Sequence, residues 1–125
     1  MVAVLGGNGG IGLASAKAFA SEGARVVITG RNATTLETAR RDIGGDTLAL
    51  RSDISELQQI TGLMERIRQE RDRIDVLFVN AGIGAFGPPE DVTEDYWERM
   101  IGTNLEGPFC AVQKAGLRAL ARNLG

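Results

Sequence analysis

The sequence predicts one α/β domain spanning residues 1–125, a doubly wound parallel sheet of four strands with flanking helices. Two observations lead to this fold class. Short apolar segments at residues 2–5, 25–29, 48–51 and 76–79 alternate with amphipathic helical segments, and a glycine-rich turn joins the first strand to the first helix. Parallel strands joined by right-handed crossovers form an open sheet covered by helices on both faces.

The first strand and the turn after it carry the strongest functional signal. Four apolar residues, Val2 to Leu5, precede a run rich in glycine from Gly6 to Gly12, and Ile11, Ala14 and Ala18 then recur at helical spacing. The glycines can be read as Gly7-x-Gly9-x-x-Gly12 or as Gly6-x-x-x-Gly10-x-Gly12. Glycine lets the backbone approach phosphate oxygens, and the following helix directs the positive end of its dipole at the same anion. The turn therefore predicts a site for the pyrophosphate of a dinucleotide.

Two other interpretations of the glycine turn were weighed. A flexible linker is disfavoured because an apolar helical pattern follows at once. A nucleoside-triphosphate loop is excluded because no Gly-Lys-Ser/Thr follows the turn.

The next elements complete the alternation of strands and helices. The patterns Thr34-x-x-Glu37 and Ser55-x-x-Gln58 predict capping boxes at the starts of two helices. The second of these helices places apolar residues on one face, namely Leu57, Ile60, Met64 and Ile67.

The end of the second strand bears on the choice of cofactor. A carboxylate at this place usually accepts the ribose 2′-hydroxyl of NAD, whereas an arginine suits a 2′-phosphate. The sequence here is Gly30-Arg31-Asn32, without a carboxylate. We therefore expect NADP(H) to be favoured over NAD(H); the alternative is that Arg31 is an ordinary solvated arginine.

Composition narrows the function classes. The chain has 125 residues, 43% of them hydrophobic, a formal net charge of −2, one cysteine and no histidine. We expect a cytoplasmic protein without a signal peptide or membrane span, without a metal site, and without an internal disulfide. Charges of both signs alternate between Glu65 and Arg73, which indicates a solvated helix face and no nucleic-acid partner.

Taken together, these motifs resemble the classical short-chain dehydrogenase/reductase family, which has a Rossmann-like fold, from Val2 to about Phe109. The resemblance implies that Asp53 receives the adenine amino group, that Ile54 lines the adenine pocket, and that Asn80-Ala81-Gly82 supports the sheet and the ribose side of the cofactor. It implies that the helix with Thr103-Asn104-Leu105 carries the catalytic asparagine. The cofactor-binding residues expected on these grounds and from the turn are Gly6, Asn8, Gly9, Gly10, Ile11, Gly12, Arg31, Asp53, Ile54, Asn80, Ala81 and Gly82.

The chain departs from the family pattern in its catalytic residues. The family also needs a serine, and a tyrosine with a lysine four residues later. Here the single tyrosine, Tyr96, is followed at that spacing by Met100 and is interpreted as a packing residue. All four serines, Ser15, Ser21, Ser52 and Ser55, lie in the first half of the chain at places already explained by helices or turns.

Asn104 and Lys114 are the candidate remnants of the catalytic set. Asn104 has an alternative role in marking a break between two helices, and Lys114 can be read as a solvated helix lysine. Residues 114–124 are similar to the family helix that follows Tyr-x-x-x-Lys, which suggests that two helices are joined near Gln113-Lys114. Cys110 then stands where the tyrosine would be, as a buried small residue.

Two functions follow from the sequence. The first is an NADP(H)-dependent oxidoreductase that transfers hydride between nicotinamide and a small alcohol or carbonyl substrate. The alternative is an inactive NADP(H)-binding module, or a fragment that does not fold, because the catalytic serine and tyrosine are absent. The resemblance, with the family's fifth strand lost at the junction, implies a sheet of four strands in the order 3-2-1-4, with residues 76–79 at an edge. Self-association is expected because this apolar strand would present an unpaired edge.

Overall fold

The computed structural model describes residues 1–124 and contains four parallel strands in one sheet, in the order β3-β2-β1-β4. This confirms the predicted fold class and strand order. Its elements are β1 (Val2–Leu5), α1 (Gly10–Ser21), β2 (Val26–Gly30), α2 (Ala33–Ile43), β3 (Leu48–Arg51), α3 (Leu57–Arg71), β4 (Val76–Val79), a 3-10 turn (Pro89–Asp91), α4 (Glu94–Ile101), a π-helical segment (Gly102–Glu106) and α5 (Gly107–Leu124).

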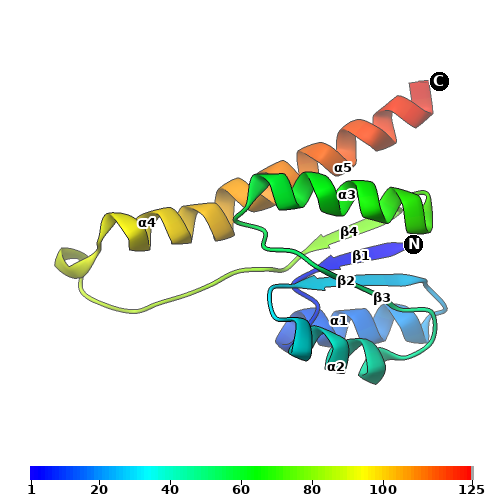
Figure 1. Cartoon of the computed structure of the whole chain (residues 1–125), viewed down its shortest axis with the longest axis horizontal. Coiled ribbons are helices and arrows are strands. Elements are labelled where there is room, and N and C mark those ends of the chain that lie inside the picture. The colour runs from blue at the N-terminus through cyan, green and yellow to red at the C-terminus, as the bar shows by residue number, and fades with distance from the viewer. Residues whose placement is uncertain (125) are drawn as a thin grey trace.

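Helices cover both faces of the sheet. Figure 1 shows α1 and α2 on one face and α3 and α5 on the other. The central strand β1 pairs with β2 on one side and with β4 on the other, and Val2 lies opposite both Val26 and Val76. All four residues of β1 are buried because helices cover both of its faces and strands flank both of its edges.

Two apolar clusters fill the layers between sheet and helices. Side chains alternate along β1, so Ala3 and Leu5 join the cluster under α3 and α5, whereas Val2 and Val4 join the cluster under α1 and α2. Because all four strands are parallel, their carboxyl ends lie at the same edge of the sheet, which helices cover on both faces.

Several details of the helices differ from the sequence predictions. The buried residues of α1 are Gly12 and Ala16, and Ile11 is 72% exposed, so the predicted stripe of Ile11, Ala14 and Ala18 is wrong. Helix α3 buries Ile60, Met64 and Ile67 as predicted, with Leu63, but leaves Leu57 on the surface.

Both predicted capping boxes are also wrong. The N-cap of α2 is Asn32, whose side chain accepts a hydrogen bond from the Thr35 amide at 3.0 Å. Helix α3 begins after Glu56, without a side-chain cap, and Ser55 instead donates to Asp53. Asparagine is as strong an N-cap as serine or threonine, and it starts α2 two residues earlier than the predicted Thr34.

The last two helices form one continuous rod through the π-helical segment, as Figure 1 shows. Asn104 therefore does not mark a break between helices. Pro108 lacks the amide that would bond back into the preceding turn, and such a gap favours the wider π turn. Helix α5 also runs without interruption through Gln113 and Lys114.

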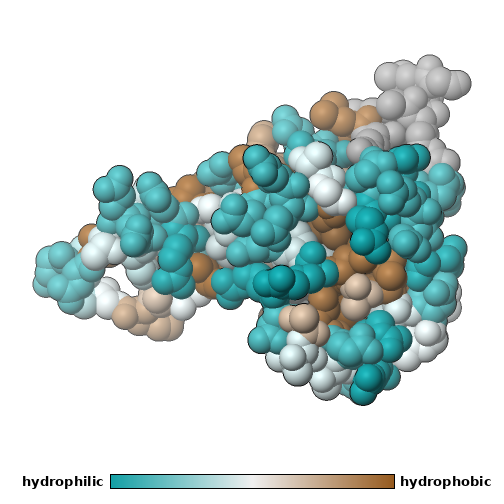
Figure 2. Space-filling view, in the orientation of Figure 1, coloured by the Kyte–Doolittle hydropathy of each residue, from teal (hydrophilic) through white to brown (hydrophobic). Residues whose placement is uncertain are grey.

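Strand β4 forms one edge of the sheet, and Val76 is 43% exposed there. The outer face of α5 also presents apolar side chains, including Phe109, which is 64% exposed. Figure 2 shows separate apolar patches along the upper edge of this face, among hydrophilic residues. Among residues 1–124 we find no helix with the length and apolar character needed to cross a membrane.

Candidate functional site

A cavity of about 650 Å³ opens at the carboxyl ends of the strands. It collects most of the residues predicted to bind a cofactor, from all four strand ends. Those that line it are Gly6, Asn8, Gly9, Arg31, Ile54, Asn80, Ala81 and Gly82, joined by Thr29, Gly30, Asn32, Thr35, Ser52, Ile83 and Thr103. Of the remaining predicted residues, Gly10, Ile11 and Gly12 lie in the first turn of α1, beside the wall that Gly9 forms.

The glycine turn is held so tightly that two positions exclude any other residue. Gly6 has φ +84°, in the left-handed region. A Cβ on Gly12 would lie 1.8 Å from the Gly6 carbonyl oxygen. Gly10 also has a positive φ, whereas nothing lies within 4 Å of a Cβ placed on Gly9. A Cβ on Gly7 would also lie 2.7 Å from the Ile28 side chain, so both interpretations of the spacing contain glycines that the structure requires.

Helix α1 begins at the cavity with free backbone donors. Its N-cap is Gly9, which makes no side-chain cap, and its first turn contains no acidic residue. The first amides of a helix have no partner within the helix, and they carry the positive end of its dipole. The Ile11 side chain faces solvent, so Ile11 would bind an anion at this place through its backbone amide.

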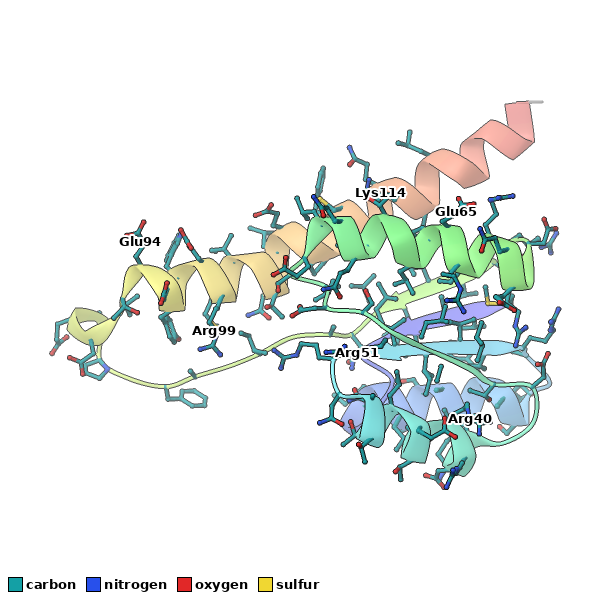
Figure 3. The ribbon with its side chains drawn as sticks, viewed as in Figure 1. Arg40, Arg51, Glu65, Glu94, Arg99 and Lys114 are labelled. Carbon is teal, nitrogen blue, oxygen red and sulfur yellow. The ribbon has the colours of Figure 1, made fainter. Side chains whose placement is uncertain are left out.

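Arg31 is the one charged side chain among the described residues that line the cavity. Arg51, at the end of β3, donates from Nε to the Arg31 carbonyl oxygen at 2.9 Å and brings a second guanidinium to the same rim. Figure 3 shows Arg51 beside the sheet edge. No carboxylate from residues 1–124 lines this cavity.

Asn8 links the glycine turn to the start of α2. Its Nδ2 donates to Thr35 Oγ1 at 3.0 Å, and its side chain lies against Gly30, where a Cβ would come within 2.8 Å of it. Asn32, Thr35 and Arg51 were not predicted as site residues. The end of β2 was a signal for Asn32 and Thr35, and the end of β3 was a signal for Arg51, because the strand ends meet at this edge.

Asp53 and Ile54 take different positions after β3. The Asp53 carboxylate accepts from the Ser55 amide at 2.9 Å and from Ser55 Oγ at 2.7 Å, and it does not line the cavity. Ile54 is buried and forms part of the cavity wall. A Cβ on Gly107 would lie 2.1 Å from the Ile54 carbonyl oxygen, so this glycine lets the π-helical segment close over the wall.

The segment after β4 is fixed by two asparagines. Asn80 Nδ2 donates to the Gly6 carbonyl oxygen at 3.2 Å and ties β4 to the glycine turn. Asn104 binds Ile83 twice: its Oδ1 accepts from the Ile83 amide and its Nδ2 donates to the Ile83 carbonyl oxygen, both at 2.8 Å. Asn104 itself does not line the cavity, but its neighbour Thr103 does.

Lys114 and Asn104 are not brought together. They lie ten residues apart on one continuous helical rod, roughly 15 Å along its axis at 1.5 Å per residue. Lys114 is half-buried and is not among the cavity residues. Cys110 is half-buried against the cluster under α5, so the predicted full burial of its side chain is only partly realised.

Comparison with known proteins decides the family. The model of the short chain dehydrogenase family matches residues 1–124. This chain belongs to the short chain dehydrogenase family. The NADP-dependent (R)-specific alcohol dehydrogenase of Lentilactobacillus kefiri is 36% identical over 98% of this chain and 49% of its own length. The NAD-dependent glycerol dehydrogenase of Listeria innocua is 32% identical over 98% of this chain and 48% of its own length.

Solved structures of short chain dehydrogenases have the same fold. A metagenomic short-chain oxidoreductase in complex with NADP superposes with a TM-score of 0.92 at 32% identity, covering 98% of this chain and 57% of the other. The chain spans about half the length of the curated relatives it matches. Members of the family bind nicotinamide cofactors, and the relatives' names include both NADP and NAD dependence.

Proposed function

We propose that this chain supplies the cofactor-binding half of an NADP(H)-dependent oxidoreductase, which transfers hydride between nicotinamide and an alcohol or carbonyl. One observation carries the cofactor assignment: the cavity at the strand ends contains Arg31 as its charged side chain and no carboxylate among its described lining residues. A 2′-phosphate needs a cation at this place, whereas a 2′-hydroxyl needs an acceptor.

The residues of the chain fit this cofactor in three places. The free amides of Gly10, Ile11 and Gly12 would hold the pyrophosphate. Arg31, supported by Arg51, would hold the 2′-phosphate. Asn80, Ala81 and Gly82 would border the ribose on the nicotinamide side. When bound, the nicotinamide ring supplies or accepts the hydride.

Asn104 is the residue we retain from the proposed catalytic set. Its side chain fixes the Ile83 backbone at the cavity border through two hydrogen bonds, so it would position the loop on which a substrate rests. The placement of Lys114 outside the cavity gives no support for a catalytic role. A proton donor for turnover would have to come from a residue other than Asn104, because a neutral amide does not titrate.

Self-association forms part of the proposal. The edge of β4 is exposed, and so are three apolar side chains of α5, namely Phe109, Val112 and Leu117, which a second copy of the chain could cover.

The proposed cofactor preference is tested by Arg31→Leu, with dissociation constants measured for NADPH and NADH at one salt concentration. Loss of a charge-assisted contact is expected to weaken NADPH binding by about ten- to a hundredfold and to change NADH binding little. Arg66→Leu is the matched control, because Arg66 lies on α3, outside the cavity lining, and pairs with Glu70 at 3.8 Å. Equal losses for both cofactors in Arg31→Leu would show that Arg31 does not read the 2′-phosphate.

A further inference from the structure

Ser52 carries a buried hydroxyl that has no partner in the described structure. The residue is 5% exposed, and its Oγ makes no hydrogen bond within residues 1–124. It follows β3 directly and forms part of the cavity wall. A buried hydroxyl without a partner is costly, so such a group in a native fold needs an explanation.

Two further buried hydroxyl residues border the same part of the cavity. Thr29 lies opposite Leu50 in the sheet, and Ser52 is two residues beyond Leu50, so side-chain alternation places Ser52 and Thr29 on the same face. Thr103 comes from the π-helical segment that covers this face. All three line the cavity, yet the Ser52 hydroxyl bonds to neither threonine.

The strand order indicates which part of a dinucleotide reaches this place. The glycine turn follows β1, Arg31 follows β2, and Ser52 follows β3, in the spatial order β3-β2-β1-β4. With the pyrophosphate at the turn and the 2′-phosphate at Arg31, the base attached to that ribose extends toward β3. Ile54 offers an apolar surface for a flat ring, and the hydroxyls offer donors and acceptors for its polar edge.

We propose that the Ser52 hydroxyl hydrogen-bonds the adenine ring of the bound cofactor, and this inference rests on the proposed function. The hydroxyl is sealed from solvent in the present conformation, and one rotation about χ1 to another staggered rotamer changes its direction. The ligand thus provides the partner that the free protein lacks, and Ser52 becomes a cofactor-binding residue.

The proposal predicts opposite effects of Ser52→Ala on the free protein and on binding. Removal of an unpartnered hydroxyl should leave the Tm of the free chain unchanged or raise it. The same substitution should raise the dissociation constants of NADPH and of 2′,5′-ADP, which lacks the nicotinamide, by a similar factor of about three to ten.

Thr47→Val is the matched control. Thr47 is also buried, but its hydroxyl donates to the Gly44 carbonyl oxygen at 2.6 Å and it lies outside the cavity lining. This variant should lower the Tm of the free chain and leave both dissociation constants unchanged.

Three results would overturn the inference. Dissociation constants of Ser52→Ala within twofold of the wild type would mean that the hydroxyl does not contact the ligand. A lower Tm together with weaker binding would mean that Ser52 supports the fold instead. Failure of the wild-type chain itself to bind NADPH or 2′,5′-ADP would reject the proposed function along with the inference, and the wild-type titration separates this case from the other two.

Discussion

At the scale of single residues, Gly12 shows how the glycine turn and the first helix are held together. Its Cα faces the Gly6 carbonyl oxygen so closely that a methyl group would overlap it, and Asn80 Nδ2 lies on the same side. The strand, the turn and the helix can therefore meet only if this position has no side chain. The Gly12 contact brings the amides of α1 to the cavity and Asn80 to the turn.

This contact predicts contrasting effects for two glycine-to-alanine changes. Gly12→Ala should destabilise the chain by about 1–3 kcal/mol or more, because the backbone must move to admit the methyl group. Gly62→Ala, in α3 with nothing within 4 Å of its Cβ, should stabilise it by roughly 0.5–1 kcal/mol through helix propensity. Urea unfolding of both variants measures the two signs. A Gly12→Ala variant as stable as the wild type would contradict the described packing.

Residue-scale predictions from sequence succeeded where local chemistry decides and failed where packing decides. The glycine turn and Arg31 line the cavity as residues that the sequence singled out, because few residue types suit those two places; their roles in cofactor binding stay predictions. The exposed Ile11 and the cap at Asn32 were missed because the rotation and first residue of a helix depend on what it packs against. Ser52 is not among the site residues that the sequence predicts, because no sequence pattern shows that a hydroxyl lacks a partner.

At the scale of elements, side chains from α4 and the π-helical segment hydrogen-bond the backbone of the loop between β4 and α4. Asn104 holds Ile83, and the Tyr96 hydroxyl donates to the Ala85 carbonyl oxygen at 2.9 Å. Tyr96 therefore has a defined hydrogen-bonding role in addition to its half-buried packing. The π-helical segment aims Asn104 at the loop, a role that the sequence motif alone did not reveal.

Loss of these contacts should loosen the loop. Asn104→Ala removes two hydrogen bonds and Tyr96→Phe removes one, so amide hydrogen exchange at Ile83 should accelerate more in the first variant than in the second. The amide of Ile28, in the central part of the sheet, serves as the internal reference. Equally fast exchange at Ile83 in the wild type and in Asn104→Ala would show that the two Asn104 hydrogen bonds do not hold the loop.

Helix α2 contains an exposed ion pair with a defined pH dependence. Glu37 accepts from Arg40 at 2.7 and 2.9 Å, and this pairing, with Arg41, lowers the pKa of Glu37 to about 2. Arg40 is labelled on α2 in Figure 3. Because the pKa in the folded state is depressed, the contribution of Glu37 is present above its usual value of about 4.5 and is lost as the pH falls toward 2.

Glu37→Gln should therefore lower the Tm slightly at pH 7, and the difference from the wild type should disappear near pH 2. Thermal melts of both proteins across this range test the pairing. A Tm difference that is as large at pH 2 as at pH 7 would show that the carboxylate charge does not matter.

At the scale of the whole molecule, the doubly wound sheet was predictable because apolar strands alternate with amphipathic helices, and the strand order was implied by the resemblance to the family. The continuous rod of α4 and α5 was not predictable, since Gly107 and Pro108 read as a helix boundary. The rod presents three exposed apolar side chains of α5, Phe109, Val112 and Leu117, whereas the outer surfaces of α2 and α3 carry ion pairs such as Arg40–Glu37 and Arg68–Glu65.

The exposed α5 face predicts a change in oligomeric state. The wild-type chain should associate with increasing concentration, and Phe109→Lys should shift it toward the monomer by placing a charge on that face. Leu57→Lys, at a partly exposed position on α3, is the control and should leave the association unchanged. Light scattering after size-exclusion chromatography measures both. A wild-type chain that is monomeric at every concentration would refute the predicted association.

The central claim is that the cavity at the strand ends binds an NADP-type dinucleotide. The most direct test is a titration of the ¹⁵N-labelled chain with NADP⁺, followed by backbone amide chemical shifts. We predict saturable shifts at Gly9 to Gly12, Arg31, Ile54 and Ala81, with tighter binding than in a parallel titration with NAD⁺. The absence of saturable shifts, or shifts confined to a surface away from this cavity, would contradict the account.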